Sequence, residues 1–154
     1  MNYNDLTTEK TNKNSRHLDR MTTREIVRVI NDEDKTVPFA VERELDDISR
    51  AIDLIADRLR NGGRLIYIGA GTSGRLGIID ATECPPTYGV SPELIQGVIA
   101  GGHPAMFRSS EGMEDVAEDA AADLDAVGFS SKDVCMAISA SGSAAYCRGA
   151  LEYA

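Results

Sequence analysis

The stretch YIGAGTSGRLGIIDATECPPT, residues 67–87, places spaced glycines between an apolar run and a second, longer apolar segment. The residues that lead into it, RLIYIG at 64–69, form a short apolar run bounded by glycines, which is typical of a buried strand. The glycine spacing G-x-G-x-x-G joins such a strand to a helix in many α/β proteins. We therefore expect a strand, a tight turn, and a helix that begins after Gly74 and extends towards Ala81.

Two further apolar runs repeat this pattern along the chain. LIQGVIAGG at 94–102 and DVCMAISASG at 133–142 each end in small residues. Between them, the alanine-rich segment at 111–128 predicts a helix that ends at Gly128. Strands that alternate with helices predict a parallel sheet and the α/β class. Because the carboxyl ends of parallel strands share one edge, the loops GAGTSG, AGGHPA and SASGSAA should meet there.

The N-terminal part of the chain has a different pattern. Residues 1–20 are polar and irregular, and predict an arm without a core. Thr22 and Glu25 have the spacing of a capping box, and apolar residues follow them, so a short helix should start there. The segment NDEDKTVP at 31–38 should break this helix.

A longer amphipathic helix is predicted next. Apolar residues recur every three or four positions from Val41 to Leu59, and Asn61-Gly62-Gly63 provides a C-terminal stop. The predicted organisation is an N-terminal arm with helices at 1–60 and an α/β domain at 61–154.

Composition excludes several classes of protein. The chain has 154 residues and a formal net charge of −9, which argues against a nucleic-acid partner. It has no apolar run of about 18 residues and its N-terminus is polar, so we expect a cytoplasmic protein with no membrane partner. The odd number of cysteines, three, predicts reduced thiols, and the two histidines lack the spacing of a metal site.

The hydroxyl groups in two of the loops favour a phosphate ligand. A G-x-G-x-x-G turn alone also fits a dinucleotide fold, or a plain turn in which Ser73 caps the helix. Thr72 and Ser73 add donors that a dinucleotide turn does not need, and a helix N-terminus attracts anions. The third loop again presents small and hydroxyl-bearing residues: Ser139, Ser141, Gly142 and Ser143. Two such loops at one sheet edge could converge on a single sugar phosphate.

Several segments in order carry a resemblance to a known family. They are TEKTNKNSRHLD, NDEDKTV, GGRLIYIGAGTSGRLGIIDATECPPTYGV, IAGG and EGMED. Together they resemble the N-acetylmuramic acid 6-phosphate etherase family of the sugar isomerase (SIS) superfamily, whose close relative is the glucokinase regulatory protein. The resemblance implies a flavodoxin-like, three-layer α/β/α domain of the SIS type after the N-terminal arm. Family members are about twice as long, so we expect an incomplete sheet and a truncated member.

The resemblance also implies a reaction and a site. The family cleaves the D-lactyl ether of N-acetylmuramic acid 6-phosphate in cell-wall amino-sugar recycling, by elimination and water addition, without a metal or other cofactor. Two glutamates fall on the catalytic positions: Glu83 as the acid that protonates the leaving lactate and Glu114 as the base at C2. The implied phosphosugar-binding residues are Gly71, Thr72, Ser73, Gly74, Arg75, Ser139, Ser141 and Ser143. The family also implies a homodimer with the site near the subunit boundary.

Other interpretations of these residues stay open. Glu114 lies in a run of acidic residues that fits a solvated helix face, and Glu83 fits an exposed carboxylate at a helix end. The third loop has Ala144-Ala145 where the family usually has Thr-Pro. A non-catalytic phosphosugar-binding or regulatory module is therefore the alternative, and a nucleotide-binding Rossmann protein is a third hypothesis.

Overall fold

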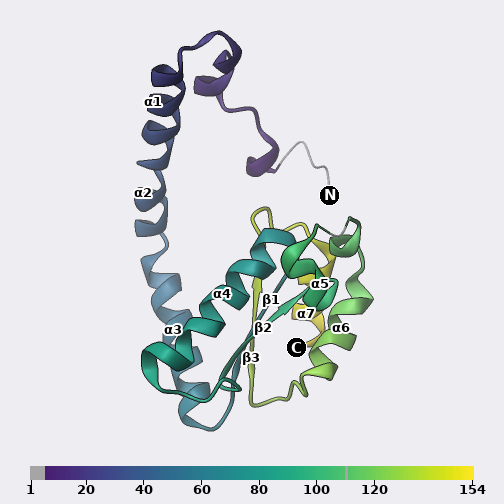
Figure 1. Cartoon of the computed structure of the whole chain (residues 1–154). Coiled ribbons are helices and arrows are strands. Elements are labelled where there is room, and N and C mark those ends of the chain that lie inside the picture. The colour runs from purple at the N-terminus through teal and green to yellow at the C-terminus, as the bar shows by residue number, and fades with distance from the viewer. Residues whose placement is uncertain (1–5, 110) are drawn as a thin grey trace. The chain divides into compact units, whose positions relative to one another are not determined.

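The computed structural model describes residues 6–109 and 111–154, which divide into two compact units. The first unit extends to Asp53, and the second runs from Leu54 to Ala154. Figure 1 shows the succession of helices and strands along the chain.

The first unit is built from short helices. They are η2 (Thr7–Glu9), η3 (Lys13–Ser15), η4 (Leu18–Arg20), α1 (Thr23–Asp34), α2 (Val37–Glu42) and the beginning of α3 (Leu45–Arg60). The predicted capping box is confirmed, because the Glu25 N–H donates to the Thr22 hydroxyl and the Thr22 N–H donates to the Glu25 carboxylate. The predicted break within 31–38 is confirmed but is short: α1 continues to Asp34, and a two-residue turn at 35–36 separates it from α2.

The amphipathic helix predicted from Val41 is divided by a turn. Helix α2 ends at Glu42 and α3 begins at Leu45. The predicted stop is confirmed: Gly62 has φ 81° and donates to the Leu59 carbonyl, and Gly63 donates to the Arg58 carbonyl over 2.9 Å. This pair of bonds is a Schellman motif, which satisfies the last carbonyls of the helix.

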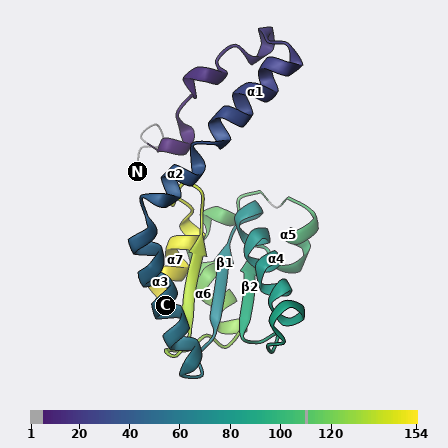
Figure 2. The ribbon, with the colours of Figure 1, turned by 90° about the vertical axis from the view of Figure 1, so that its left-hand side faces the viewer.

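The second unit contains a parallel sheet of three strands in the described residues. Strands β1 (Leu65–Gly69), β2 (Ile95–Ile99) and β3 (Val134–Ile138) have the order β2-β1-β3. Figure 2 shows them side by side with β1 in the middle. Gly69 lies opposite Ile99 on one side and Ile138 on the other, so all three strands end at one edge. The predicted α/β class is confirmed.

Helices cover both faces of this sheet. The helical elements of this unit after β1 are α4 (Gly71–Tyr88), α5 (Gly102–Phe107), η5 (Met113–Asp115), α6 (Ala117–Ala126) and α7 (Ala145–Tyr153). Helix α4 lies on one side of the strands, and α6 and α7 lie on the other (Figure 1). The unit therefore has the three layers expected of an α/β/α domain.

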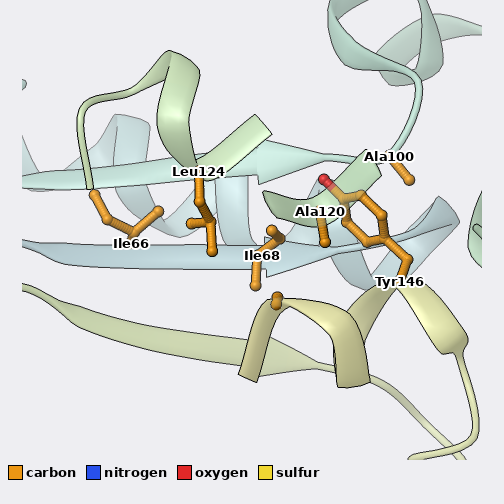
Figure 3. Close-up of a cluster of buried hydrophobic side chains, with 7 residues drawn as sticks. Ile66, Ile68, Ala100, Ala120, Leu124 and Tyr146 are labelled. Carbon is orange, nitrogen blue, oxygen red and sulfur yellow. The ribbon is translucent and has the colours of Figure 1, made fainter. Parts of the chain in front are cut away.

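The main core lies between β1 and the pair α6 and α7. Figure 3 shows Ile66 and Ile68 of β1 pointing towards Ala120 and Leu124 of α6 and towards Tyr146 of α7. Each of these five side chains is fully shielded from solvent. Burial of these apolar side chains supplies the main driving force for this layer. It also fixes the level at which the strands end, and therefore the position of the loops that follow them.

The other face of β1 packs against α4 through glycine. A Cβ at Gly77 would lie 2.8 Å from the Cβ of Tyr67, so no larger residue fits there without movement. This close approach holds the helix flat on the strand. Among the described residues, none of the helices combines the length and the apolar character needed to span a membrane.

Candidate functional site

Three connections meet at the carboxyl edge of the sheet. The register places the residues after Gly69, Ile99 and Ile138 at the same level, with the β1 loop between the other two. This edge is where open α/β sheets bind their ligands. The register confirms that the three small-residue loops begin at the same edge of the sheet.

The first loop is shorter than expected, because α4 begins at Gly71 rather than after Gly74. Gly71 has φ 55°, a conformation that glycine adopts without strain. Thr72 and Ser73 are therefore part of the first helical turn. The N-cap is Ala70, and no side chain among the described residues caps it, so the interpretation of Ser73 as a cap is wrong. Among the described residues, no side chain caps the first N–H groups of α4. Uncapped N–H groups at a helix N-terminus favour the binding of an anion.

Gly74 brings this first turn close to the strand. A Cβ at this position would lie 2.5 Å from the Gly69 carbonyl oxygen and 2.7 Å from Cγ1 of Ile99. Neither neighbour is the free end of a flexible side chain. The glycine is thus required for close packing of the helix on the strand, which is the role of the third glycine in this motif.

A cavity of about 160 Å³ opens beside this turn. Its wall includes residues from the first connection, from the second connection and from the segment before α6: Gly71, Arg75, Ala100, Ala105, Glu111 and Glu114. Of the residues predicted from sequence, the cavity brings together Gly71, Arg75 and Glu114. The remaining predicted residues do not line it.

Arg75 is held firmly at the cavity wall. The half-buried guanidinium donates from Nε to the Met106 carbonyl over 3.0 Å and from Nη2 to the Ala105 carbonyl over 2.7 Å. Both acceptors lie near the C-terminal end of α5. The side chain therefore connects α4 to α5 and places a permanent positive charge beside the cavity.

The sequence predicts that Glu114 lies on the alanine-rich helix, and this prediction is wrong. It lies in the 3-10 turn η5, which starts after Gly112 with φ 74° and ends before the extended residue Val116. Helix α6 begins only at Ala117. The left-handed glycine and the extended valine interrupt the helix, and this break turns Glu114 towards the cavity wall. Burial, together with the nearby Glu114 charge, raises the pKa of the Cys147 thiol.

Glu111 is a cavity residue that the sequence analysis did not select. It appeared only as one member of an acidic run. The signal that could have selected it is its position in the long connection after β2, because such connections lie at the carboxyl edge of a parallel sheet.

Glu83 does not line the cavity. The sequence predicts a helix that extends towards Ala81, with Glu83 at its end, but α4 continues through Pro85 and Pro86 to Tyr88. Glu83 is an exposed residue within this helix, twelve positions after Gly71. At 1.5 Å per residue this corresponds to roughly 18 Å along the helix axis. The adjacent Cys84 is a protonated thiol, since burial and the charges of Asp80 and Glu83 raise its pKa.

The third loop is internally hydrogen-bonded. The Gly142 N–H donates to the Ser139 hydroxyl, and the Ser143 N–H donates to the Ser141 hydroxyl. The hydroxyls of Ser141 and Ser143 are 2.6 Å apart. These contacts form a compact turn around Gly142, at φ 71°. The three hydroxyls thus lie in an ordered loop at the correct edge, outside the cavity wall.

No group of three or more His, Cys, Asp or Glu side chains in residues 6–109 and 111–154 is arranged to hold a metal ion. The charged groups that line the cavity are one guanidinium and two carboxylates. A guanidinium can bind an anion, and carboxylates can accept or donate protons.

Comparison with known proteins agrees with this fold. The model of the family described as "Glucokinase regulatory protein N-terminal SIS domain" matches residues 47–154. The chain therefore belongs to this SIS family, and the fold class predicted from sequence is confirmed.

Individual curated relatives show which members of the superfamily the chain resembles. The chain is 54% identical over its whole length to an N-acetylmuramic acid 6-phosphate etherase of Clostridium beijerinckii, of which the match covers 51%. It is 56% identical to a protein of the same name from Actinobacillus pleuropneumoniae, over 97% of the chain and 49% of the relative. The corresponding protein of Escherichia fergusonii is 54% identical over all of the chain and 52% of the relative. The predicted resemblance to etherases is thus confirmed, and the chain spans about half the length of the curated relatives it matches.

Proposed function

We propose that this chain carries the phosphosugar-binding portion of an N-acetylmuramic acid 6-phosphate etherase and contributes its catalytic base. The supporting observation is that Gly71, at the start of α4, lines one cavity at the carboxyl edge of the sheet together with Arg75 and Glu114. The ligand class is proposed from the 54% identity of the chain, over its full length, to a protein named as this etherase.

The phosphate end of the proposed site is the first turn of α4. The backbone N–H groups of Gly71, Thr72 and Ser73 and the partial positive charge of the helix terminus favour an anion there. Gly74 allows the turn to lie on the strand, and the Arg75 charge adds to the attraction. In this proposal the third loop closes the phosphate end through its hydroxyl residues: Ser139, Ser141 and Ser143.

The proposed reaction is an elimination followed by an addition. The open-chain aldehyde of the sugar makes the C2 proton acidic, and the Glu114 carboxylate removes it. The electron pair forms a C2–C3 double bond, and the C3–O bond breaks with its electrons on the lactate oxygen. A proton from Glu83 converts this oxygen to the hydroxyl of D-lactate. Water then adds at C3 and a proton returns to C2, which gives N-acetylglucosamine 6-phosphate without a metal or organic cofactor.

Within a single chain, Glu83 is too far from the cavity to act as the proposed acid. It is exposed, it does not line the cavity, and it lies roughly 18 Å along α4 from Gly71. We therefore propose that a homodimer provides it, so that Glu83 of one copy acts at the cavity of the other. A cavity of about 160 Å³ also falls below the roughly 300–1,000 Å³ of a typical small-molecule site, and additional protein surface would enlarge it.

A second candidate is a non-catalytic module that binds a phosphosugar and regulates another protein. The position of Glu83 outside the cavity favours it, because binding needs only the anion-attracting turn and the charge of Arg75. Either function would place the protein in the cytoplasm, in the recycling of cell-wall amino sugars or its control.

The test measures D-lactate release from N-acetylmuramic acid 6-phosphate, beside calorimetric titration with N-acetylglucosamine 6-phosphate. We expect release by the unaltered chain and a loss of about 100-fold or more in the Glu114→Gln variant, which lacks the base. Glu118→Gln is the matched control, since Glu118 is exposed on the neighbouring helix α6. Phosphosugar binding without lactate release would support the regulatory candidate, and the absence of both would overturn the two proposals together.

A further inference from the structure

Arg75 makes hydrogen bonds that a side chain with no role beyond binding phosphate would not need. Two of the five N–H donors of its guanidinium are engaged by the carbonyls of Ala105 and Met106, at 2.7 and 3.0 Å. Carbonyls in the last turn of a helix have no intrahelical partner, so Arg75 satisfies groups that α5 itself leaves unpaired. Ala105 is also buried, which keeps the end of α5 in place against its neighbours.

The segment that follows α5 leads directly to the cavity wall. Arg108 is extended after the helix, and its N–H donates to the Pro104 carbonyl over 3.1 Å. A few residues further on, Glu111, Met113 and Glu114 line the cavity. The position of the C-terminal end of α5 therefore determines where this part of the cavity wall begins.

We infer that Arg75 is a positioning residue, which ties the wall that carries Glu114 to the helix turn that would hold the phosphate. This inference rests on the proposed function for its ligand. Through the two carbonyl bonds, the distance between the first turn of α4 and Glu114 is set before any ligand binds. The planar guanidinium suits this role because its donors have a rigid spacing, whereas a lysine ammonium provides the same charge from a single nitrogen.

The experiment separates this role from that of an anion ligand. Arg75→Lys keeps the charge and loses the rigid fork, and Arg75→Met loses both. Arg148→Lys is the matched control, because Arg148 is an exposed residue of α7 for which the described residues offer no side-chain hydrogen bond. Amide hydrogen exchange is followed by NMR in the ligand-free chain at the N–H groups of Arg108, Asp115 and, as an internal reference, Leu65.

In both Arg75 variants we expect the amides of Arg108 and Asp115 to exchange about tenfold faster or more, because the end of α5 opens more often. The Leu65 amide, which donates to the Leu94 carbonyl beside the core, should keep its wild-type rate. Arg75→Lys should bind N-acetylglucosamine 6-phosphate within about threefold of wild type, since the charge is retained. Wild-type exchange at Arg108 and Asp115 in both variants would overturn the inference, whatever the affinity does.

A second signal excludes a purely structural effect. The methyl group of Met113 reports on the cavity wall, and that of Met136 on β3 reports on the sheet. On titration with N-acetylglucosamine 6-phosphate, Met113 should shift in the wild type and lose most of that shift in Arg75→Lys, while Met136 stays unchanged in both. An equal Met113 response in the two proteins contradicts the inference. Failure of the wild type to bind the phosphosugar would instead count against the proposed function, and the ligand-free exchange rates would still decide the role of Arg75.

Discussion

At the scale of single residues, the ion pair between Arg64 and Asp133 is more buried than the other ion pairs of the described residues. The Asp133 carboxylate, with only 3% of its side chain exposed, accepts from Nε and Nη2 of Arg64 and from the N–H of Ser130. Replacement by Asn leaves the Arg64 charge without its counter-ion. We expect Asp133→Asn to lower the free energy of unfolding by about 3 kcal/mol at pH 7, measured by urea denaturation. The exposed Glu152→Gln variant should change it by less than about 0.5 kcal/mol.

The same residue predicts a dependence on pH. The hydrogen bond with Arg64, helped by those from Ser130, lowers the pKa of Asp133 from 3.8 to about 2. A depressed pKa means that the stabilisation is complete above about pH 4 and is lost as the pH falls towards 2. The loss amounts to about 2 kcal/mol and should be absent from the Asn variant. An equal loss in both proteins between pH 4 and pH 2 would show that other carboxylates are responsible.

At the scale of elements, two glycines at the start of α4 should respond differently to the same change. A methyl group at Gly74 meets the Gly69 carbonyl at 2.5 Å, whereas at Gly71 it meets nothing within 4 Å and only the positive φ is unfavourable. We expect Gly74→Ala to cost about 3 kcal/mol because the helix must move off the strand, and Gly71→Ala to cost about 1 kcal/mol. Urea denaturation of both variants tests this, and equal costs would contradict the close packing of the first turn.

The boundaries of α4 and α6 show how far the sequence could predict the elements and the site. The strand positions and the parallel sheet could be predicted from the apolar runs bounded by glycines, because such runs are typical of buried strands. The extension of α4 through Pro85 and Pro86 could not be foreseen, since packing of the buried Ala81 and Cys84 outweighs the local preference to end the helix. The position of Glu114 depends on the left-handed Gly112, a conformation that the residue type permits and does not require. The family resemblance, rather than the local pattern, implied roles for Arg75 and Glu114, and only the fold shows that they share a cavity with Glu111.

At the scale of the whole molecule, the two units differ in how they are stabilised. The core cluster lies entirely in the second unit, whereas α1 and α2 contain no buried residue. Apolar side chains of the first unit, such as Val27 and Phe39, are 59% and 63% exposed. The contacts that support α1 are its capping box and the side-chain amides of Asn12 and Asn14, which donate to Glu33. A twelve-residue helix with such support is marginal in water, because helix formation needs either greater length or a buried face.

Amide hydrogen exchange of the intact chain should therefore separate the two units. We expect the amides of α1 to exchange at least about 100-fold faster than those of Ile66 and Ile68, because α1 opens locally while β1 opens only when the core unfolds. The Thr22→Ala variant, which removes the capping hydroxyl, should raise exchange in α1 further and leave β1 unchanged. Equal protection of α1 and β1 would mean that the apolar face of α1 is covered in solution. Dependence of that protection on protein concentration would then identify a second copy of the chain as the cover.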